Sequence, residues 1–283
     1  RGAGYLRIHP SVTDMPKVTV HYHTKAQPSN TYPEENAHRL WQYVGAPGKG
    51  TIATSTSTTS LYQWKESEGG WVKKTDTRPM KPFVEGYAIT QDGAPDYFWT
   101  TTAINDNQSI PLSYTEGVRR NEGAEEPISG QTVIANSYFA PINVAAFVDN
   151  DFTGNIERTF YLFNTGSWTE WNTAKDTPYV DLTAQDQSSG HYTAIPVFGS
   201  QDFDLLLDPT FIPPMSGIFV RTGSDDCTIN FDYERLVWNW DDSNKAAINR
   251  VHAPSRVAGQ SQQTYAPELL RRIRIQAYGE GSG

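Results

Sequence analysis

The chain has 283 residues, of which 12% are aromatic and only 19% are charged, and this length suffices for one large domain or two ordinary ones. Its formal net charge of −9 argues against nucleic acid or anionic lipid as a partner, because both attract basic surfaces. Its single cysteine, Cys227, excludes a disulfide within the chain, and no apolar run approaches the roughly 20 residues that a membrane span needs.

Short strands separated by polar turns are predicted along the first half of the chain. Residues 6–9 and 18–23 alternate between apolar and polar side chains, which is the pattern of half-buried strands. Further strands are expected at residues 39–44, 61–64, 71–74, 83–90, 97–101 and 110–114. Residues 116–130 then combine charge, glycine and proline with little apolar content, which indicates a boundary between two units.

The second half of the chain repeats this organisation. A strand is expected at residues 131–134, a hairpin at residues 159–171 and another strand after Gly217. A polar insertion at residues 172–210 separates the hairpin from that last strand. Insertions map to loops, and loops carry function more often than scaffolds do.

The end of the chain is predicted to leave the second unit. Residues 241–266 are polar and indicate a linker. Residues 269–277 alternate again and are expected to form the first strand of a following module. The predicted domains are a first unit at 1–128, a second at 129–240, and the linker with its strand at 241–283.

Two stretches of the chain repeat one pattern of aromatic, glycine and small apolar residues. The first copy contains Trp41-Gln-Tyr-Val-Gly-Ala-Pro47, Leu61-Tyr-Gln-Trp64 and Phe83-Val-Glu-Gly-Tyr-Ala-Ile-Thr90. The second contains Val133-Ile-Ala-Asn136, Phe160-Tyr-Leu-Phe163 and Met215-Ser-Gly-Ile-Phe-Val-Arg-Thr222. With this repeat and no long helical pattern, the sequence predicts an all-β protein made of two related antiparallel β-sandwich (jelly-roll-like) units in tandem, with few or no helices.

Aromatic side chains are the candidate binding residues. Exposed aromatic rings can stack on sugar rings, and their polar tips suit wet interfaces. The candidates for such a carbohydrate platform are Trp71, Trp99, Trp168 and Trp171, aided by the loop carboxylates of Asp202 and Asp204. Because most aromatic residues recur in both copies, the competing interpretation is that they form the core and the hairpin scaffold. Function is then expected where the copies differ, in the 172–210 insertion and in the loop that begins at Asp149.

The loop that begins at Asp149 is the candidate metal site. Its oxygen-bearing candidate ligands are Asp149, Asp151, Thr153 and Asn155. Their spacing, with a glycine at the sixth position, follows an EF-hand calcium loop. Such a loop also needs a bidentate glutamate at its twelfth position, where this chain has Phe160, and turns rich in Asp and Asn also occur without metal. Calcium therefore stays a candidate ligand, and no other cofactor is predicted.

Four phrases of the chain resemble a known kind of module. They are Trp41-Gln-Tyr-Val-Gly45, Gly86-Tyr-Ala-Ile-Thr90, Ile134-Ala-Asn-Ser-Tyr138 with the following Ala140-Pro-Ile142, and Ile212-Pro-Pro-Met-Ser-Gly-Ile-Phe-Val220. Together they resemble the repeated β-rich modules of large secreted and surface proteins of Bacteroidetes, which are adhesin-like and associated with type IX secretion. The chain departs from that pattern at Asn136-Ser137, where proline is more usual, and at Met215-Ser216, which replaces Gly-Gln. The resemblance implies export to the cell surface or the medium, and it brings no catalytic residue with it.

The sequence predicts a protein that is not an enzyme, since no catalytic motif stands out. The leading prediction is an extracellular module of a larger bacterial surface or secreted protein, serving as an adhesion, spacer or ligand-display scaffold. Its expected partners are the adjoining domains of that protein, with glycans and host or bacterial surface proteins as candidates. Two alternatives stay open: a carbohydrate-binding module that uses exposed aromatic residues, and an accessory domain of a secreted hydrolase.

Overall fold

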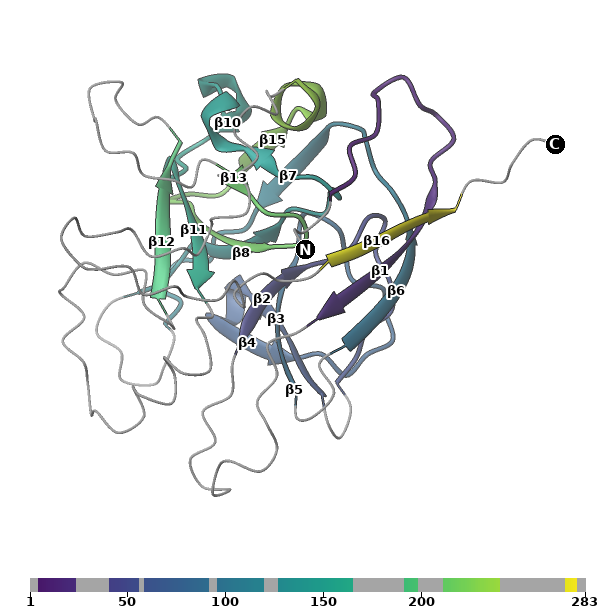
Figure 1. Ribbon diagram of the computed structural model, residues 1–283. Coiled ribbons are helices and arrows are strands. Elements are labelled where there is room, and N and C mark those ends of the chain that lie inside the picture. The colour runs from purple at the N-terminus through teal and green to yellow at the C-terminus, as the bar shows by residue number, and fades with distance from the viewer. Residues whose placement is uncertain are drawn as a thin grey trace, which may run out of the picture.

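The computed structural model describes residues 5–23, 41–55, 59–91, 96–119, 127–164, 191–197, 211–239 and 273–278. These residues form mostly β-strands, which pair antiparallel in several sheets (Figure 1). Helical structure among them is limited to short 3₁₀ turns and one π-helical turn, Glu234–Trp238. The predicted all-β, sandwich-like fold with few helices is therefore confirmed.

The described strands are distributed along the chain from Lys17 to Tyr278. The first half contributes β1 (Lys17–His23), β2 (Gln42–Gly45), β3 (Thr59–Lys65), β4 (Gly70–Lys73), β5 (Gly86–Gln91), β6 (Asp96–Thr102) and β7 (Gln108–Leu112). The second half contributes β8 (Gln131–Ala135), β9 (Ile142–Asn143), β10 (Phe152–Thr153), β11 (Thr159–Asn164), β12 (His191–Pro196), β13 (Phe211–Ile212), β14 (Gly217–Arg221), β15 (Cys227–Phe231) and β16 (Ile273–Tyr278). The 3₁₀ turns are η2 (Glu66–Glu68), η3 (Val144–Ala146) and η4 (Asp149–Asp151), and the π turn is η5.

The two sequence copies form two four-stranded sheets that have the same strand order. The first copy gives the order β2-β5-β3-β4, and the second gives β8-β14-β11-β12. In each sheet the strand that closes the copy, β5 or β14, lies between the strand that opens the copy and the strand that follows it, β3 or β11. The other described partner of β11 is β12, which lies within the insertion predicted at residues 172–210, so this part of the insertion is a strand and not a loop. The repeat in the sequence is therefore a repeat of one sheet.

These two central sheets lie between two outer sheets. One face of the first central sheet packs against the β16-β1-β6 sheet, in a buried cluster that includes Val44 and Val20. One face of the second packs against the β10-β15-β7 sheet, in a buried cluster that includes Ile218 and Ile229. Figure 1 shows β16, β1 and β6 at the right and β10, β15 and β7 at the top, with the central sheets below and to the left. Side chains alternate between the two faces of a strand. The residues that alternate with those in the two buried clusters therefore lie on the opposite faces of the central sheets.

The remaining faces of the two central sheets meet in what we call the central aromatic cluster. Its buried members are Tyr43, Trp64, Ala88, Val133 and Phe219, and Trp41, Tyr62, Trp71, Ile128, Tyr161 and Phe163 pack around them. Trp64 crosses between the copies, because its indole Nε1 donates a hydrogen bond to the main-chain oxygen of Gln131 at 2.5 Å. Its ring also meets that of Phe219 edge to face, with 5.0 Å between the centroids. The recurring aromatic residues thus form the contact between the copies.

Glycines at equivalent places in the two copies let the central sheets approach each other. A Cβ at Gly86 would lie 2.2 Å from Cγ1 of Val133, and one at Gly217 would lie 3.1 Å from Cβ of Tyr43. At the neighbouring Gly45, the main-chain N–H donates a hydrogen bond to the main-chain oxygen of Met215 at 2.8 Å. The glycine that recurs in both copies is therefore explained by close packing between them.

Two strand pairings join parts of the chain that the sequence assigned to different domains. β7 of the predicted first unit pairs with β15 of the second, with Leu112 opposite Cys227. The strand predicted at residues 269–277 is β16, and it pairs with β1 of the same chain, with Tyr278 opposite Lys17 (Figure 1). The prediction made that strand the start of a following module, whereas its partner in the described residues is at the other end of the chain. The domain boundaries stay predictions.

A buried glutamate fixes the hairpin of the first copy to the segment between the copies. The Glu66 carboxylate accepts hydrogen bonds from the main-chain N–H groups of Thr115 and Gly130, both at 2.8 Å, and from the Thr115 hydroxyl at 2.7 Å. Its side chain is buried, and a buried charge is tolerated when hydrogen bonds satisfy it in this way. Glu66 is thus a structural residue.

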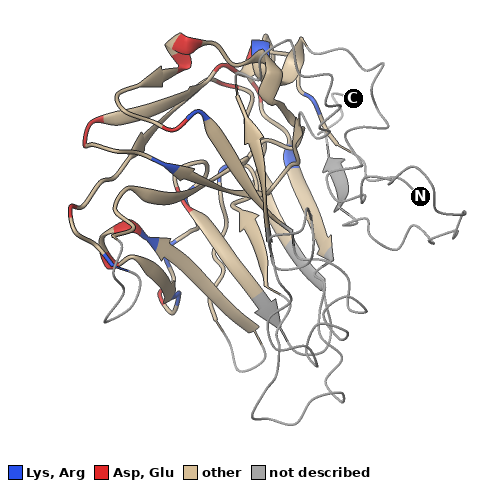
Figure 2. Cartoon of the chain, turned by 90° about the vertical axis from the view of Figure 1, so that its left-hand side faces the viewer, with Lys and Arg blue, Asp and Glu red and all other residues tan. Residues whose placement is uncertain are grey.

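Charged residues of both signs lie mainly at turns and strand ends of the described chain (Figure 2). One group of them follows β4, where the buried Lys74 ammonium donates hydrogen bonds to Oδ1 of Asp76 and, at 2.8 Å, to the main-chain oxygen of Arg78. Arg78 in turn donates to Oδ2 of Asp76 from Nε at 3.1 Å and from Nη2 at 2.9 Å. The hydrogen bonds from Lys74 and Arg78 lower the pKa of the Asp76 carboxyl to about 2.

We expect Asp76→Asn to lower the melting temperature near neutral pH, with a difference from the native chain that closes in acid. In the unfolded chain an aspartate carboxyl titrates at about 3.9. Because its pKa is lower in the folded chain, the ionised form stabilises folding fully above about pH 4, and this contribution disappears as the pH falls toward about 2. Melting curves of both proteins over that pH range, followed by circular dichroism, check this. A difference that stays constant with pH would contradict it.

Candidate functional site

The structure describes two of the four tryptophans predicted to bind sugar. Trp99, in β6, is only 5% exposed and lies in the buried cluster between the first central sheet and β1, with its ring 5.8 Å from that of Tyr22. A ring buried in this way offers no open face to a ligand, so Trp99 is a core residue. Trp71, in β4, is half-buried in the central aromatic cluster. Trp168, Trp171, Asp202 and Asp204 lie outside the described residues.

The candidate calcium loop contains one buried carboxylate, which already has partners. Arg235 of η5 donates hydrogen bonds to Oδ2 of Asp151 from Nη1 at 2.9 Å and to Oδ1 from Nη2 at 2.6 Å. The main-chain N–H of Val148 also donates to Oδ2, at 2.8 Å. Both carboxylate oxygens of Asp151 are thus occupied, in the bidentate geometry that makes Arg–carboxylate pairs strong.

The other candidate ligands of this loop are exposed. They are Asp149, Thr153 and Asn155. Among the described residues, no group of three or more His, Cys, Asp or Glu side chains is placed to hold a metal ion. The calcium site stays a prediction, and it would require Asp151 to exchange its bonds with Arg235 for a cation.

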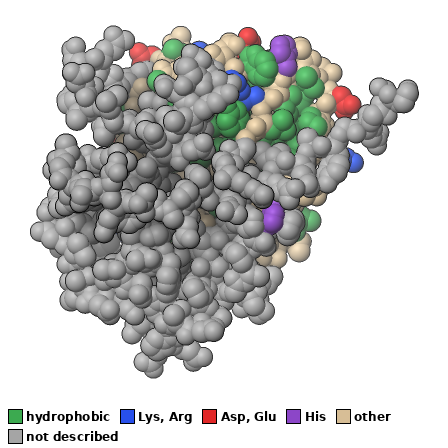
Figure 3. Space-filling model, viewed as in Figure 1, with side chains coloured by type: hydrophobic (Ala, Val, Ile, Leu, Met, Phe, Trp, Pro, Cys, Tyr) green, Lys and Arg blue, Asp and Glu red, His purple; other side chains and the backbone are tan. Residues whose placement is uncertain are grey.

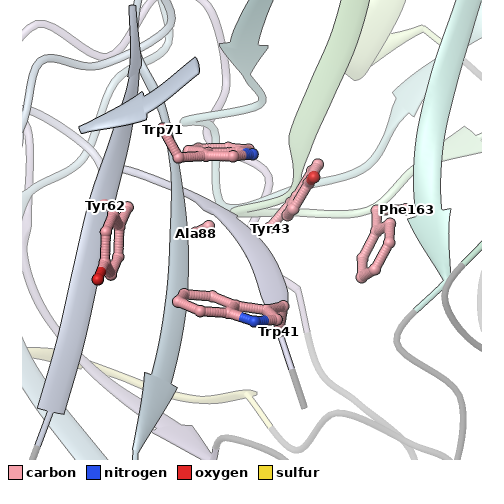
Figure 4. A pocket seen from close by; sticks show the side chains of 6 residues that line it. All are labelled: Trp41, Tyr43, Tyr62, Trp71, Ala88 and Phe163. Carbon is pink, nitrogen blue, oxygen red and sulfur yellow. The ribbon is translucent and has the colours of Figure 1, made fainter. Parts of the chain in front are cut away.

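A pocket of about 280 Å³ lies within the central aromatic cluster, and we call it the aromatic pocket. Its lining residues are Trp41, Tyr43, Tyr62, Trp71, Ala88 and Phe163 (Figure 4). All of these belong to the first copy except Phe163, which β11 of the second copy contributes. None of the six carries a charge. The pocket therefore lies where the two copies meet and is formed chiefly by one of them.

The strand register explains why a pocket forms at this place. Tyr43 of β2 and Tyr62 of β3 both pair with Ala88 of β5, so the three side chains stand in one row on one face of the sheet. Because the alanine side chain ends at Cβ, a gap stays open between the two tyrosine rings. The indoles of Trp71 and Trp41 lie on opposite sides of this gap (Figure 4). The pocket is thus a box of aromatic rings with a small residue at its base.

Contacts between rings hold the walls of the aromatic pocket in place. Tyr43 stacks on Phe163 with 4.5 Å between the centroids and 15° between the planes. Trp41 meets Tyr62 edge to face at 5.3 Å and 80°. The hydroxyl of Tyr43 shares a hydrogen bond of 2.7 Å with the hydroxyl of Tyr192 in β12. Each aromatic pair contributes about 0.5–1.5 kcal/mol beyond its buried area, so these contacts stabilise the walls of the pocket.

The second copy has a large residue where the first has Ala88. Phe219 of β14 pairs with Tyr161 of β11 and with Val133 of β8, which are the places that Tyr62 and Tyr43 occupy in the first copy. Phe219 is 6% exposed, and its own ring fills the place between those two neighbours. The copies therefore differ at two places in this row, because Val133 and Phe219 of the second copy stand where the first has Tyr43 and Ala88, and the small residue that leaves the gap is Ala88.

A lysine stands beside the aromatic pocket. Lys73 of β4 is directly opposite Tyr62 of β3, which puts both side chains on the same face of the sheet. Lys73 is exposed. The nearest charge that the register places next to the pocket is therefore positive.

Of the six residues that line the aromatic pocket, the sequence predicts only Trp71 as a binding residue. Tyr43, Tyr62 and Trp41 belong to the repeated phrases and were interpreted as scaffold, and Ala88 carries no chemistry of its own. The sequence signal that could have predicted the pocket is the contrast of Ala88 with Phe219 at the same place in the repeat.

On the described part of the face in Figure 3, hydrophobic side chains are interleaved with polar and charged ones.

The chain is similar to part of a curated bacterial surface protein. The chain is 27% identical over 214 residues to the minor fimbrium subunit Mfa5 of Porphyromonas gingivalis. This match covers 71% of the chain but only 16% of that protein. No protein-family model and no solved structure matches the chain.

No helix in the described part of the chain has the length and apolar character that crossing a membrane requires. Porphyromonas gingivalis is one of the Bacteroidetes, the group whose surface modules the motifs of this chain resemble. Over most of its length, the chain is thus similar to one part of a bacterial fimbrial subunit.

Proposed function

We propose that the chain is a non-catalytic module of a larger bacterial surface protein, where it serves in adhesion by displaying a ligand-binding surface. The observation that carries this proposal is the similarity to a minor fimbrium subunit, of which the chain spans 16%. A module of this kind acts outside the cell or at the cell surface. Its partners would be the adjoining domains of the same protein and a ligand on another surface.

The chemistry of the buried polar groups supports binding rather than catalysis. The two carboxylates that are buried among the described residues, those of Glu66 and Asp151, both accept hydrogen bonds that connect segments of the fold. None of the six described lining residues of the aromatic pocket is an acid, histidine, serine or cysteine that could serve as a base or a nucleophile. Apolar walls with a few polar tips are the usual composition of a binding site.

A pure spacer and an accessory domain of a hydrolase are the competing roles. A spacer needs only a rigid fold, and its aromatic residues would pack without leaving a pocket. The aromatic pocket favours ligand display over the spacer role, because filling it with a larger residue, as in the second copy, would add buried area.

Adhesion by the isolated chain tests the proposal. Beads coated with the full chain should attach to epithelial or bacterial cells at several times the level of beads coated with an unrelated β-sandwich protein of similar charge. The control of similar charge is needed because the net charge of −9 affects non-specific attachment. Attachment at the control level on every cell type would contradict an adhesive role and leave the spacer role.

A further inference from the structure

We propose that the aromatic pocket binds one pyranose ring of a glycan, held between the indoles of Trp41 and Trp71 above Ala88. This inference rests on the proposed adhesive function and assigns it a ligand class and a place. Nothing in the fold requires the pocket, since the second copy builds the same sheet with Phe219 at the equivalent position.

The shape of the pocket fits a flat, saturated ring. A pyranose has C–H groups on its two faces and hydroxyl groups around its edge. Trp41 and Trp71 lie on opposite sides of the gap over Ala88 (Figure 4), so a ring inserted there contacts an aromatic face on each side. A volume of about 280 Å³ is just below the roughly 300–1,000 Å³ of pockets for drug-sized ligands, so the pocket suits a single sugar ring.

The polar tips of the lining residues suit the edge of that ring. The indole N–H groups of Trp41 and Trp71 are donors, and the Tyr62 hydroxyl can donate or accept. Tyr43 is already oriented by its hydrogen bond to Tyr192. Aromatic residues with one polar end are typical of sites where an apolar face meets a hydroxyl-rich ligand in water.

The charge near the pocket argues against a cation as the ligand. Cages of aromatic rings also bind quaternary ammonium groups and the side chains of lysine and arginine. The six lining residues provide no carboxylate to pair with a cation, although the chain as a whole is acidic. Lys73 would repel one, since it is directly opposite Tyr62 on the neighbouring strand and carries a positive charge. The charge of Lys73 does not oppose the binding of a neutral sugar, and it favours the binding of a sugar that carries a carboxylate.

Titration of the full chain with defined probes tests this inference. The probes are the methyl glycosides of glucose, galactose, mannose, N-acetylglucosamine and glucuronic acid, with choline and N-acetylarginine amide as cationic probes. Tryptophan fluorescence and isothermal calorimetry measure binding. We expect at least one glycoside to bind, and to bind more tightly than either cation.

Two variants locate the binding site, and a third is the control. Ala88→Phe introduces the residue that the second copy has at the equivalent place. Its ring fills the pocket, so glycoside binding should be lost. Trp41→Ala removes one of the two stacked rings and should weaken binding roughly three- to tenfold. Ile52→Ala changes an exposed residue that does not line the pocket and should leave the affinity unchanged. A melting temperature for each variant shows whether it is folded, and Trp41→Ala keeps the test valid if Ala88→Phe does not fold.

The outcomes separate this inference from the proposed function. Glycoside binding that survives both pocket variants, tighter binding of a cation than of any glycoside, or no glycoside binding would overturn the inference. Beads coated with Ala88→Phe distinguish the two proposals, because adhesion that persists on them leaves the module adhesive through another surface. If native beads do not adhere while a glycoside binds the pocket, the adhesive role fails and the sugar site stands.

Discussion

Gly86→Ala is expected to lower the free energy of unfolding by about 3 kcal/mol, because the two central sheets approach each other at this glycine. The added Cβ would lie 2.2 Å from Cγ1 and 2.9 Å from Cβ of Val133, and 3.0 Å from the main-chain oxygen of Ile134. These atoms belong to β8 of the second copy, so the methyl group can be accommodated only if the copies move apart. Urea denaturation followed by circular dichroism measures the loss.

Gly70→Ala is the matched control for that substitution. Gly70 also begins a strand of the first central sheet, but a Cβ there would meet only the main-chain oxygen of Glu68, at 3.9 Å. Its free energy of unfolding should stay within about 0.5 kcal/mol of the native value. Equal and small effects at both glycines would contradict the close packing of the two copies.

Arg235→Met is expected to destabilise the chain by about 3 kcal/mol, because it leaves the Asp151 carboxylate buried without its partner. Asp151 is 5% exposed, and both of its oxygens accept hydrogen bonds from the guanidinium. Methionine keeps much of the volume and the apolar stem of arginine but offers no donor. The loss should be seen in both the urea midpoint and the melting temperature.

Arg221→Met is the control for this pair. Arg221 faces Glu157 at 3.7 Å, and both side chains are largely open to solvent, at 54% and 36% exposure. An exposed pair of this kind contributes about 0–1 kcal/mol. If Arg235→Met cost no more than Arg221→Met, the buried Asp151 carboxylate would not depend on Arg235, which would contradict the structural role of this pair.

The strands and the repeat could be predicted from the sequence because both are local. Period-two alternation marks most of the longer strands, and the matching phrases mark two sheets with one order. The exception is β12, which lies within the insertion predicted at residues 172–210 and was missed. Contacts between distant residues could not be predicted in this way. Neither the pairing of β1 with β16 nor the bond between Asp151 and Arg235, which are 84 residues apart, leaves a periodic signal. The spacing of the acidic loop therefore indicated a metal, whereas the fold supplies Asp151 with an arginine.

The candidate site could be predicted only in part for a related reason. Aromatic residues were expected to be either core or platform, and the structure places Trp99 in the core and Trp71 at a pocket. Sequence alone gives the parity of each side chain but not which of two sheets will cover its face. The decisive residue, Ala88, acts by being small, and a small residue is informative only when its neighbours across the strands are known.

A crystal structure of the full chain with the methyl glycoside that binds best tests the central claim most directly. The claim is that the two copies face each other through their recurring aromatic residues and that Ala88 opens a sugar site in one of them. We predict one pyranose ring between the indoles of Trp41 and Trp71, above Ala88. A sugar bound elsewhere while the pocket holds none, or central sheets that do not face each other, would contradict the claim.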